Sequence, residues 1–183
     1  MAAALQLKPL SLYVDPAVAL VDARLKDLLA YWQDKRGERP MPARADIAPA
    51  DMVTHLPRLA LLNVTEPGQG PEDFSVRLSG TGIDDLLGKD HRGARLGDML
   101  PQPEARLVAA ALAALVEHKR PMRFFADARL PGNPEAQVEG IALPLGPDNG
   151  PVNMILLETV LIRQADLLNF PELRFDGPAA AAS

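Results

Sequence analysis

The chain of 183 residues contains no cysteine. This absence excludes disulfide bridges, thiolate metal sites and cysteine nucleophiles. It also excludes any photocycle that depends on a cysteinyl adduct. Whatever chemistry or signalling the protein performs must use other side chains.

The chain also lacks an excess of positive charge. Its formal net charge is -5 at pH 7, and its 19 lysines and arginines are scattered along the sequence instead of forming a stripe. A nucleic-acid-binding surface needs a concentrated basic patch. We therefore expect no nucleic-acid partner.

Long hydrophobic runs are missing as well. The longest candidate, Met154-Ile-Leu-Leu, ends at Glu158, far short of the roughly 20 apolar residues of a membrane-spanning helix. The start, Met1-Ala-Ala-Ala-Leu-Gln-Leu-Lys, has no basic region typical of a signal peptide. Since 48% of the residues are hydrophobic, a chain of this length can bury one sizeable core. With neither a membrane span nor a signal peptide predicted, we expect a cytoplasmic protein.

An amphipathic helix is predicted near the N-terminus. Asp15-Pro16 combines an N-cap residue with a proline suited to the first helical position. Lys35-Arg36-Gly37 supplies a basic last turn and a glycine stop. Between them, apolar residues recur on one helical face: Val18, Val21, Leu25, Leu28, Leu29 and Trp32.

A proline-rich connector follows over residues 39–57, where four prolines forbid a long helix. We expect residues 1–57 to form the N-terminal helix and this connector, both packed on a core. Residues 58–163 would form the core, and 164–183 a C-terminal extension whose last residues are disordered.

The core pattern begins with two strands, Leu59–Thr65 and Phe74–Ser79, the second with alternating apolar and polar residues. Short helical turns broken by glycines follow, and then a long helix opened by Pro103. Three more strands are predicted over Met122–Leu130, Val138–Leu145 and Val152–Ile162.

The last of these strands is apolar on both faces, so it should lie at the centre of the sheet with both faces covered. We assign the first helix to its outer face and the glycine-broken helices to its inner face. The sequence thus predicts an α+β fold.

Several short motifs occur in a characteristic order: Tyr31-Trp32, Pro42-Ala-Arg-Ala-Asp-Ile-Ala-Pro49, Leu56-Pro57, Arg77-Leu-Ser-Gly-Thr81, and Leu87-Gly88 with Gly93. In order and spacing, the chain from about Leu25 to Ile162 resembles the freestanding alphaproteobacterial PAS proteins grouped as the PAS_5 family. The resemblance implies a PAS fold, with a five-stranded antiparallel sheet of order 2-1-5-4-3, a helical crossover on one face and the N-terminal helix on the other. It also implies bacterial signal transduction, often in control of motility or the cell cycle, with no shared catalytic residues.

Glycine-broken helices over a sheet leave room for an apolar hollow. We predict that its lining comprises Leu86, Leu87, Met99, Leu107, Ala111, Phe124 and Met154. Arg77 is expected to pair across the sheet or with Asp46, or else to hold an anionic group of a ligand. Thr81 is expected to cap the turn after the second strand.

No metal, heme or flavin site is expected. Asp84, Asp85, Asp90 and His91 lack metal-ligand spacing, since no second histidine lies three or four residues from His91. We assign Asp90-His91 to a solvated loop. His91 and His118 also lie outside the part of the long helix that faces the hollow, and no Asn/Gln cluster marks a flavin ring.

Three functions remain open. The first is a single-domain sensory adaptor that acts by protein-protein contact and holds a small apolar ligand in the hollow. The second is a ligand-free scaffold that dimerises through the first helix, with Val21, Leu25, Leu28 and Trp32 as interface candidates, and through Leu167, Leu168, Phe170 and Phe175. The third is a small enzyme with a cone-shaped fold, which would need a buried titratable group with a shifted pKa that the sequence does not reveal. We favour the adaptor, without enzymatic activity, and expect signalling proteins and a second copy of the chain as partners.

Overall fold

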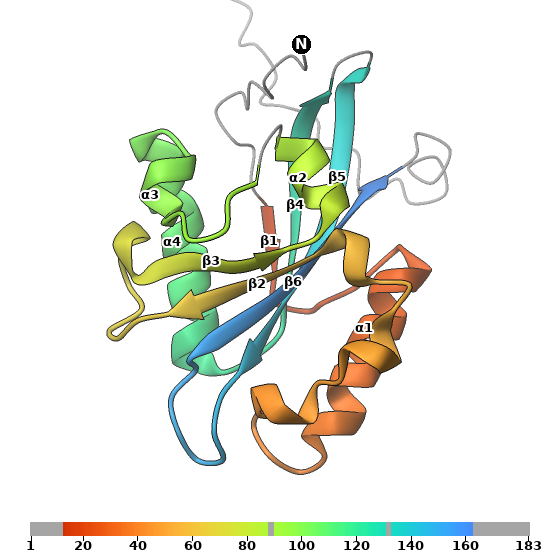
Figure 1. The fold of residues 1–183 in the computed structure, drawn as a ribbon, viewed down its shortest axis with the longest axis vertical. Helices are drawn as coiled ribbons and strands as arrows, with labels where there is room; N and C mark the ends of the chain where they lie inside the picture. Colours follow the sequence, from red (N-terminus) through yellow and green to blue (C-terminus); the bar gives the residue numbers. More distant parts are fainter. Residues whose placement is uncertain (1–12, 88–89, 131–132, 163–183) are drawn as a thin grey trace, which may run out of the picture.

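The computed structural model describes residues 13–87, 90–130 and 133–162. A single antiparallel sheet crosses the molecule, with helices on both of its faces (Figure 1). The predicted C-terminal extension, including Leu167, Leu168, Phe170 and Phe175, lies outside the described residues.

The sheet has six strands in the order β1-β4-β5-β6-β2-β3. They are β1 (Tyr13–Asp15), β2 (Leu59–Val64), β3 (Phe74–Ser79), β4 (Met122–Leu130), β5 (Asn133–Leu145) and β6 (Met154–Ile162). The prediction of five strands is therefore wrong by one, because β1 adds to the edge of β4 through the pair Val14 and Phe124. With only three residues, β1 is too short to show an alternating pattern.

Strand β6 lies between β5 and β2 and is antiparallel to both. Ile155, Leu156 and Val160 are all buried, so side chains on both faces of this strand are covered. This is the central position that its doubly apolar sequence predicts.

The N-terminal helix α1 (Ala23–Arg36) begins later than predicted. Asp22 is its N-cap, and the Asp22 carboxylate accepts a hydrogen bond from the backbone N–H of Arg24 at 2.8 Å. The Asp15 carboxylate instead accepts the N–H groups of Ala17 and Ala19, which closes a turn directly after β1. The pair Asp15-Pro16 thus has the chemistry of a cap but caps a turn.

Helix α1 packs on the outer face of β5 and β6, with Leu25, Leu28 and Trp32 at most 1% exposed. The indole Nε1 of Trp32 donates to the carbonyl of Pro144 in β5 at 2.9 Å. These three residues belong to the core of their own chain, so their prediction as interface residues is wrong. Val21 is half-buried and precedes the helix, so it does not extend an exposed apolar face either.

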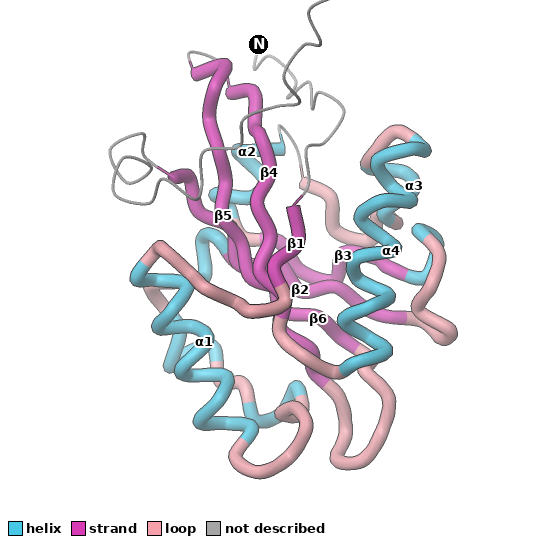
Figure 2. The backbone as a smooth tube through the Cα atoms, turned by 180° about the vertical axis from the view of Figure 1, so that it is seen from behind, coloured by secondary structure: helices cyan, strands magenta, loops and turns pink. Residues whose placement is uncertain are grey.

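The connector after α1 contains three short 3-10 turns, η1 (Arg44–Asp46), η2 (Pro49–Met52) and η3 (Leu56–Arg58). On the other face of the sheet lie α2 (Thr81–Leu87), α3 (Leu96–Met99) and α4 (Gln102–His118), and a fourth turn, η4 (Pro71–Asp73), precedes β3. Figure 2 shows α1 and α4 on opposite sides of the sheet. Among the described helices, none has the length and apolarity needed to cross a membrane.

Candidate functional site: a cavity beneath the helical crossover

A cavity of about 250 Å³ lies between the inner face of the sheet and the crossover helices. Its floor is formed by inward-facing side chains of the sheet: Val14, Ala60, Leu62, Phe74, Val76, Met122, Phe124, Ala126, Ala142 and Leu157. Its roof comes from the crossover: Ile83, Leu96, Met99, Leu100, Val108, Ala111 and Leu112. Ser79, His91 and Thr159 complete the lining.

Small residues create this space. The lining includes alanines at 60, 126 and 142 on the sheet and at 111 on α4, whose short side chains leave room that longer ones would fill. At the floor, Gly140 of β5 lies directly opposite Phe124 of β4, and a Cβ at Gly140 would collide with the Phe124 ring. The ring therefore occupies the space that a side chain at position 140 would need.

The residues predicted to line the hollow divide into three groups. Met99, Ala111 and Phe124 line the cavity. Leu86 and Leu87 lie on α2, but their side chains are outside the described part of the structure. The prediction is wrong for Leu107 and Met154, neither of which lines the cavity.

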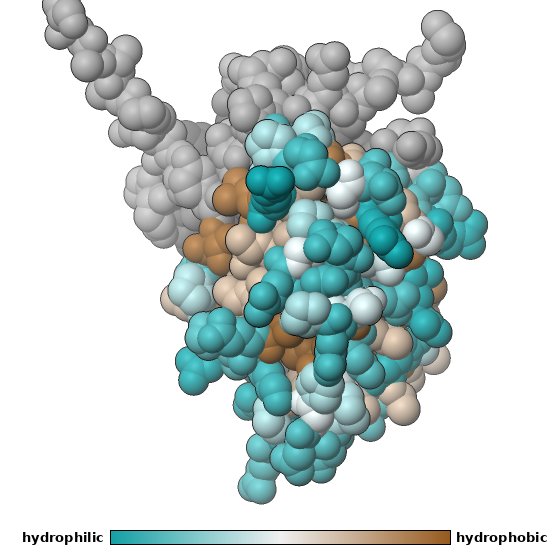
Figure 3. Space-filling model, turned by 90° about the vertical axis from the view of Figure 1, so that its left-hand side faces the viewer, coloured by the Kyte–Doolittle hydropathy of each residue, from teal (hydrophilic) through white to brown (hydrophobic). Residues whose placement is uncertain are grey.

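Leu107 is 46% exposed, because α4 carries apolar residues on more than one face and the helix turns Leu107 toward solvent. Met154 begins β6 and lies opposite Leu145 at one end of the sheet. Figure 3 shows the side of the molecule that is on the left in Figure 1, where α3 and α4 lie. That surface is mostly hydrophilic, with separate small hydrophobic areas.

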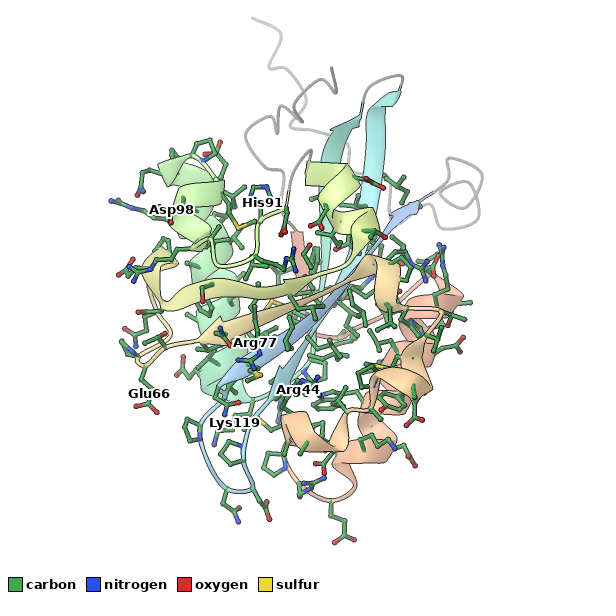
Figure 4. All side chains as sticks on the ribbon, viewed as in Figure 1. Arg44, Glu66, Arg77, His91, Asp98 and Lys119 are labelled. Atoms are coloured by element: carbon green, nitrogen blue, oxygen red, sulfur yellow. The ribbon has the colours of Figure 1, made fainter. Side chains whose placement is uncertain are left out.

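The two predicted polar residues also lie away from the cavity. Arg77 is exposed on the edge strand β3, and Figure 4 shows it on the opposite side of the β3 ribbon from His91. The predicted pair with Asp46 is wrong, since the Asp46 carboxylate lies 2.9 Å from Nη2 of Arg39. Thr81 is exposed at the first turn of α2, and neither residue is part of the lining.

His91 is the residue that sequence reasoning misplaced. It is only 8% exposed and lines the cavity, whereas its neighbour Asp90 is exposed and bonds to Arg92. A single polar residue between two charged ones carries no periodic signal, so the pattern offered no means of separating His91 from the solvated loop.

A second polar feature lies on the outer face of the sheet, beneath α1 and the connector. Glu158 of β6 has no exposed surface, and its two carboxylate oxygens contact Nδ1 of His55 at 2.8 Å and Nε of Arg58 at 3.1 Å. Burial raises the pKa of Glu158 above its ordinary value of 4.5, although both His55 and Arg58 oppose this shift. The connector is thus fixed to the central strand by a buried carboxylate.

Glu139 of β5 plays a similar part for the entry to α1. Its carboxylate accepts the N–H groups of Val21 and Asp22 at 2.9 and 2.8 Å and the Nε of Arg123 at 2.6 Å. Arg123 also contacts Asp15 at 3.2 Å. Burial disfavours the charged form of Asp15, but the N–H groups of Ala19 and Ala17, together with the Arg123 guanidinium, hold its pKa below the ordinary value.

Among the described residues that line the cavity, His91 is the one with a titratable side chain, and the others are apolar apart from Ser79 and Thr159. Across the part of the chain that the structure describes, no three His, Cys, Asp or Glu side chains are grouped so as to hold a metal ion.

An antiparallel sheet with a helical crossover over one face and a cavity between them is typical of the PAS class of domain. The PAS_5 family model, described as a PAS domain, matches residues 21–157. The match covers more than half of the chain, and the chain belongs to this family. PAS domains in general are sensory or signalling modules and are typically not enzymes. No curated protein and no solved structure matches the chain significantly.

Proposed function

We propose that the protein is a cytoplasmic sensory adaptor: it binds a small apolar ligand in the cavity and passes the signal on by protein-protein contact. The observation that carries this proposal is that α2 contacts both the cavity and the N-terminal connector. One of its residues, Ile83, lines the cavity, and the same helix contacts η3 of the N-terminal connector. A change inside the cavity therefore has a short structural route to the surface.

The first step is ligand entry. Within the described part of the chain, the lining is apolar apart from Ser79, His91 and Thr159, so transfer of an apolar molecule from water into the cavity is favourable. The volume of about 250 Å³ corresponds to roughly eight waters at ~30 Å³ each. A ligand on the order of ten non-hydrogen atoms fits that space.

The second step is movement of α2 against η3. Gly80, directly before α2, is so close to the carbonyl oxygens of Leu56 and Pro57 that an added Cβ would overlap both. The next glycine, Gly82, also lies against the Pro57 carbonyl. Because backbone meets backbone here, α2 cannot shift without displacing η3.

The third step is the response of the connector. Arg58 within η3 and His55 before it hold the Glu158 carboxylate on β6. A displaced η3 must either move with these contacts or break one of them and leave a buried charge less well paired. We propose that these two arrangements are the signalling states.

We place the contact with a partner beside this junction. Val53, just before η3, is 62% exposed, and Leu78, two residues before Gly80, is 47% exposed. Any self-association is also assigned to this surface, since the predicted α1 face is internal. The proposal needs no heme, flavin, metal or catalytic residue.

The test compares wild type with an Ala111→Phe variant, which fills the cavity from α4. Native mass spectrometry and NMR titration with isopropylbenzene report cavity binding, and affinity capture from cells reports the partner. We expect wild type to bind the probe and the variant not to bind it, with a changed set of captured proteins. Unchanged capture by a folded variant that no longer binds the probe would contradict the proposed link between cavity and partner.

A further inference from the structure

The cavity contains two polar side chains that the described part of the chain leaves without hydrogen-bond partners. Ser79 Oγ is buried, and no atom of the described structure bonds to it. The His91 side chain is 8% exposed and, among the described residues, makes no hydrogen bond either. Both line the cavity. A buried polar atom without a partner is costly, so Ser79 Oγ indicates where a ligand bonds in the cavity.

These two residues come from neighbouring segments of the cavity wall. The loop that carries His91 runs antiparallel to β3, with a bridge between Ser75 and Arg95. Gly93 N–H donates to the Val76 carbonyl at 2.7 Å, and Val76 N–H donates to the Ala94 carbonyl at 2.9 Å. The Ala94 N–H donates to the His91 carbonyl at 2.9 Å, so a tight turn over residues 91–94 places His91 at the end of this segment, while Ser79 ends the strand to which the segment is bonded. Figure 4 shows His91 in this loop, between α2 and α3.

The rest of the lining limits the charge of a ligand. Its described residues include no lysine, arginine, aspartate or glutamate. An ionised ligand would lose its hydration without gaining an opposite charge, which is strongly unfavourable. A purely apolar ligand, in turn, would leave the buried Ser79 Oγ without a hydrogen-bond partner.

We infer that the cavity selects an uncharged, mostly apolar molecule that carries one hydrogen-bonding oxygen, a carbonyl or a hydroxyl, which bonds to Ser79 Oγ, with the His91 ring as a second polar contact. The apolar part lies over Phe124 and against Met99 and Ala111. This inference rests on the proposed function, since it names the class of ligand that the sensor binds. A serine hydroxyl can donate and accept a hydrogen bond, and a neutral imidazole offers one donor and one acceptor. A carbonyl or a hydroxyl oxygen of the ligand can therefore form a hydrogen bond with these residues.

The experiment uses two probes of similar size, acetophenone and isopropylbenzene, in which a methyl group of isopropylbenzene takes the place of the carbonyl oxygen of acetophenone. Dissociation constants are measured by NMR titration for wild type, Ser79→Ala and the matched control Ser75→Ala. Ser75 is on the same strand but does not line the cavity. We expect wild type to bind acetophenone roughly fivefold more tightly than isopropylbenzene, the effect of about one buried hydrogen bond.

In Ser79→Ala this preference should fall to about twofold or less, while isopropylbenzene binds as it does to wild type. Ser75→Ala should retain the full preference. His91→Phe should also weaken the preference for acetophenone while it keeps the apolar volume of the site.

The two proposals fail in different ways. If both probes bind equally to wild type and Ser79→Ala changes nothing, the inferred ligand class is wrong while the cavity remains a binding site. If neither probe binds to folded wild type, the cavity is closed to ligands of this size, and both the inference and the sensing part of the proposed function are overturned.

Discussion

The Nδ1 atom of His55 lies 2.8 Å from Oε2 of Glu158, a fully buried carboxylate on the central strand of the sheet. Arg58 holds the other carboxylate oxygen at 3.1 Å. The connector is thus bonded to the middle of the sheet on the face opposite the cavity. This contact gives the first prediction, on pH dependence.

Because burial raises the folded-state pKa of Glu158 above 4.5, the folded protein retains a proton there that the unfolded chain has already released. Stability from this group is then present below pH 4.5 and is lost as pH rises toward the folded-state pKa. The free energy of unfolding of wild type, relative to Glu158→Gln, should therefore decline as pH rises above 4.5. Urea unfolding over a pH series measures it, with exposed Glu117→Gln as the control for loss of one charge. A difference that stays flat or rises across this range would contradict the assignment.

The second prediction concerns Arg123, which is 4% exposed and bonds to the fully buried Glu139. Arg123→Met keeps most of the apolar volume but removes the positive partner of a buried carboxylate. We expect a loss of about 3 kcal/mol in the free energy of unfolding. The exposed pair of Arg92 and Asp90 provides the comparison, and Arg92→Met should leave stability unchanged within error. Equal effects of the two substitutions would show that Glu139 does not depend on its guanidinium partner.

The third prediction tests the close approach between α2 and η3. Gly80→Ala places a Cβ against the backbone carbonyls of Leu56 and Pro57, which cannot rotate away as a side chain can. A loss of about 2 kcal/mol is expected from this overlap. Gly97→Ala on α3 is the matched change, since its Cβ would meet Pro71 at an ordinary 3.6 Å. It should be neutral or slightly stabilising because alanine favours helix. A neutral Gly80→Ala would mean that η3 yields easily, against the proposed coupling.

The fourth prediction separates a core role of α1 from a dimer interface. Leu28 has no exposed surface within its own chain. Leu28→Glu should therefore prevent folding, by circular dichroism and NMR, because it buries an unpaired charge. Leu107→Glu, at a position that is 46% exposed, should fold normally. A Leu28→Glu protein that folds as a monomer from a dimeric wild type would restore the interface hypothesis.

Much of the fold can be predicted from the periodic spacing of apolar residues along strands and helices. The alternation of Phe74 and Val76 with polar residues predicts β3, and these two side chains do face the cavity. The doubly apolar β6 predicts its own central position. Such patterns extend over many residues, so one ambiguous side chain does not change the outcome.

The features that the sequence did not predict depend on single contacts between particular residues. Asp15 has the right chemistry for a helix cap, and only the three-dimensional path of the chain shows that it caps a turn beside β1. Glu139 and Glu158 occur in strands where a charge predicts an exposed position. They are buried because their partners, Arg123, His55 and Arg58, come from distant parts of the chain.

In the cavity, too, residues in periodic patterns could be predicted and isolated ones could not. Met99, Ala111 and Phe124 are predicted by the periodicity of their elements, and all three line it. Leu107 fails because α4 is apolar on two faces, and its spacing does not reveal which face turns inward. The polar residues of the cavity have no sequence signal at all.

The central claim is that the cavity and the connector are coupled through α2, and hydrogen exchange of the backbone amides tests it most directly. The N–H of His55 bonds to the Met52 carbonyl at 2.9 Å, and that of Arg58 to the His55 carbonyl at 2.8 Å. When isopropylbenzene saturates the cavity, we predict that exchange at His55 and Arg58 changes severalfold in wild type and not in Ala111→Phe. Changes confined to residues that line the cavity, with His55 and Arg58 exchanging as in the free protein, would contradict the account.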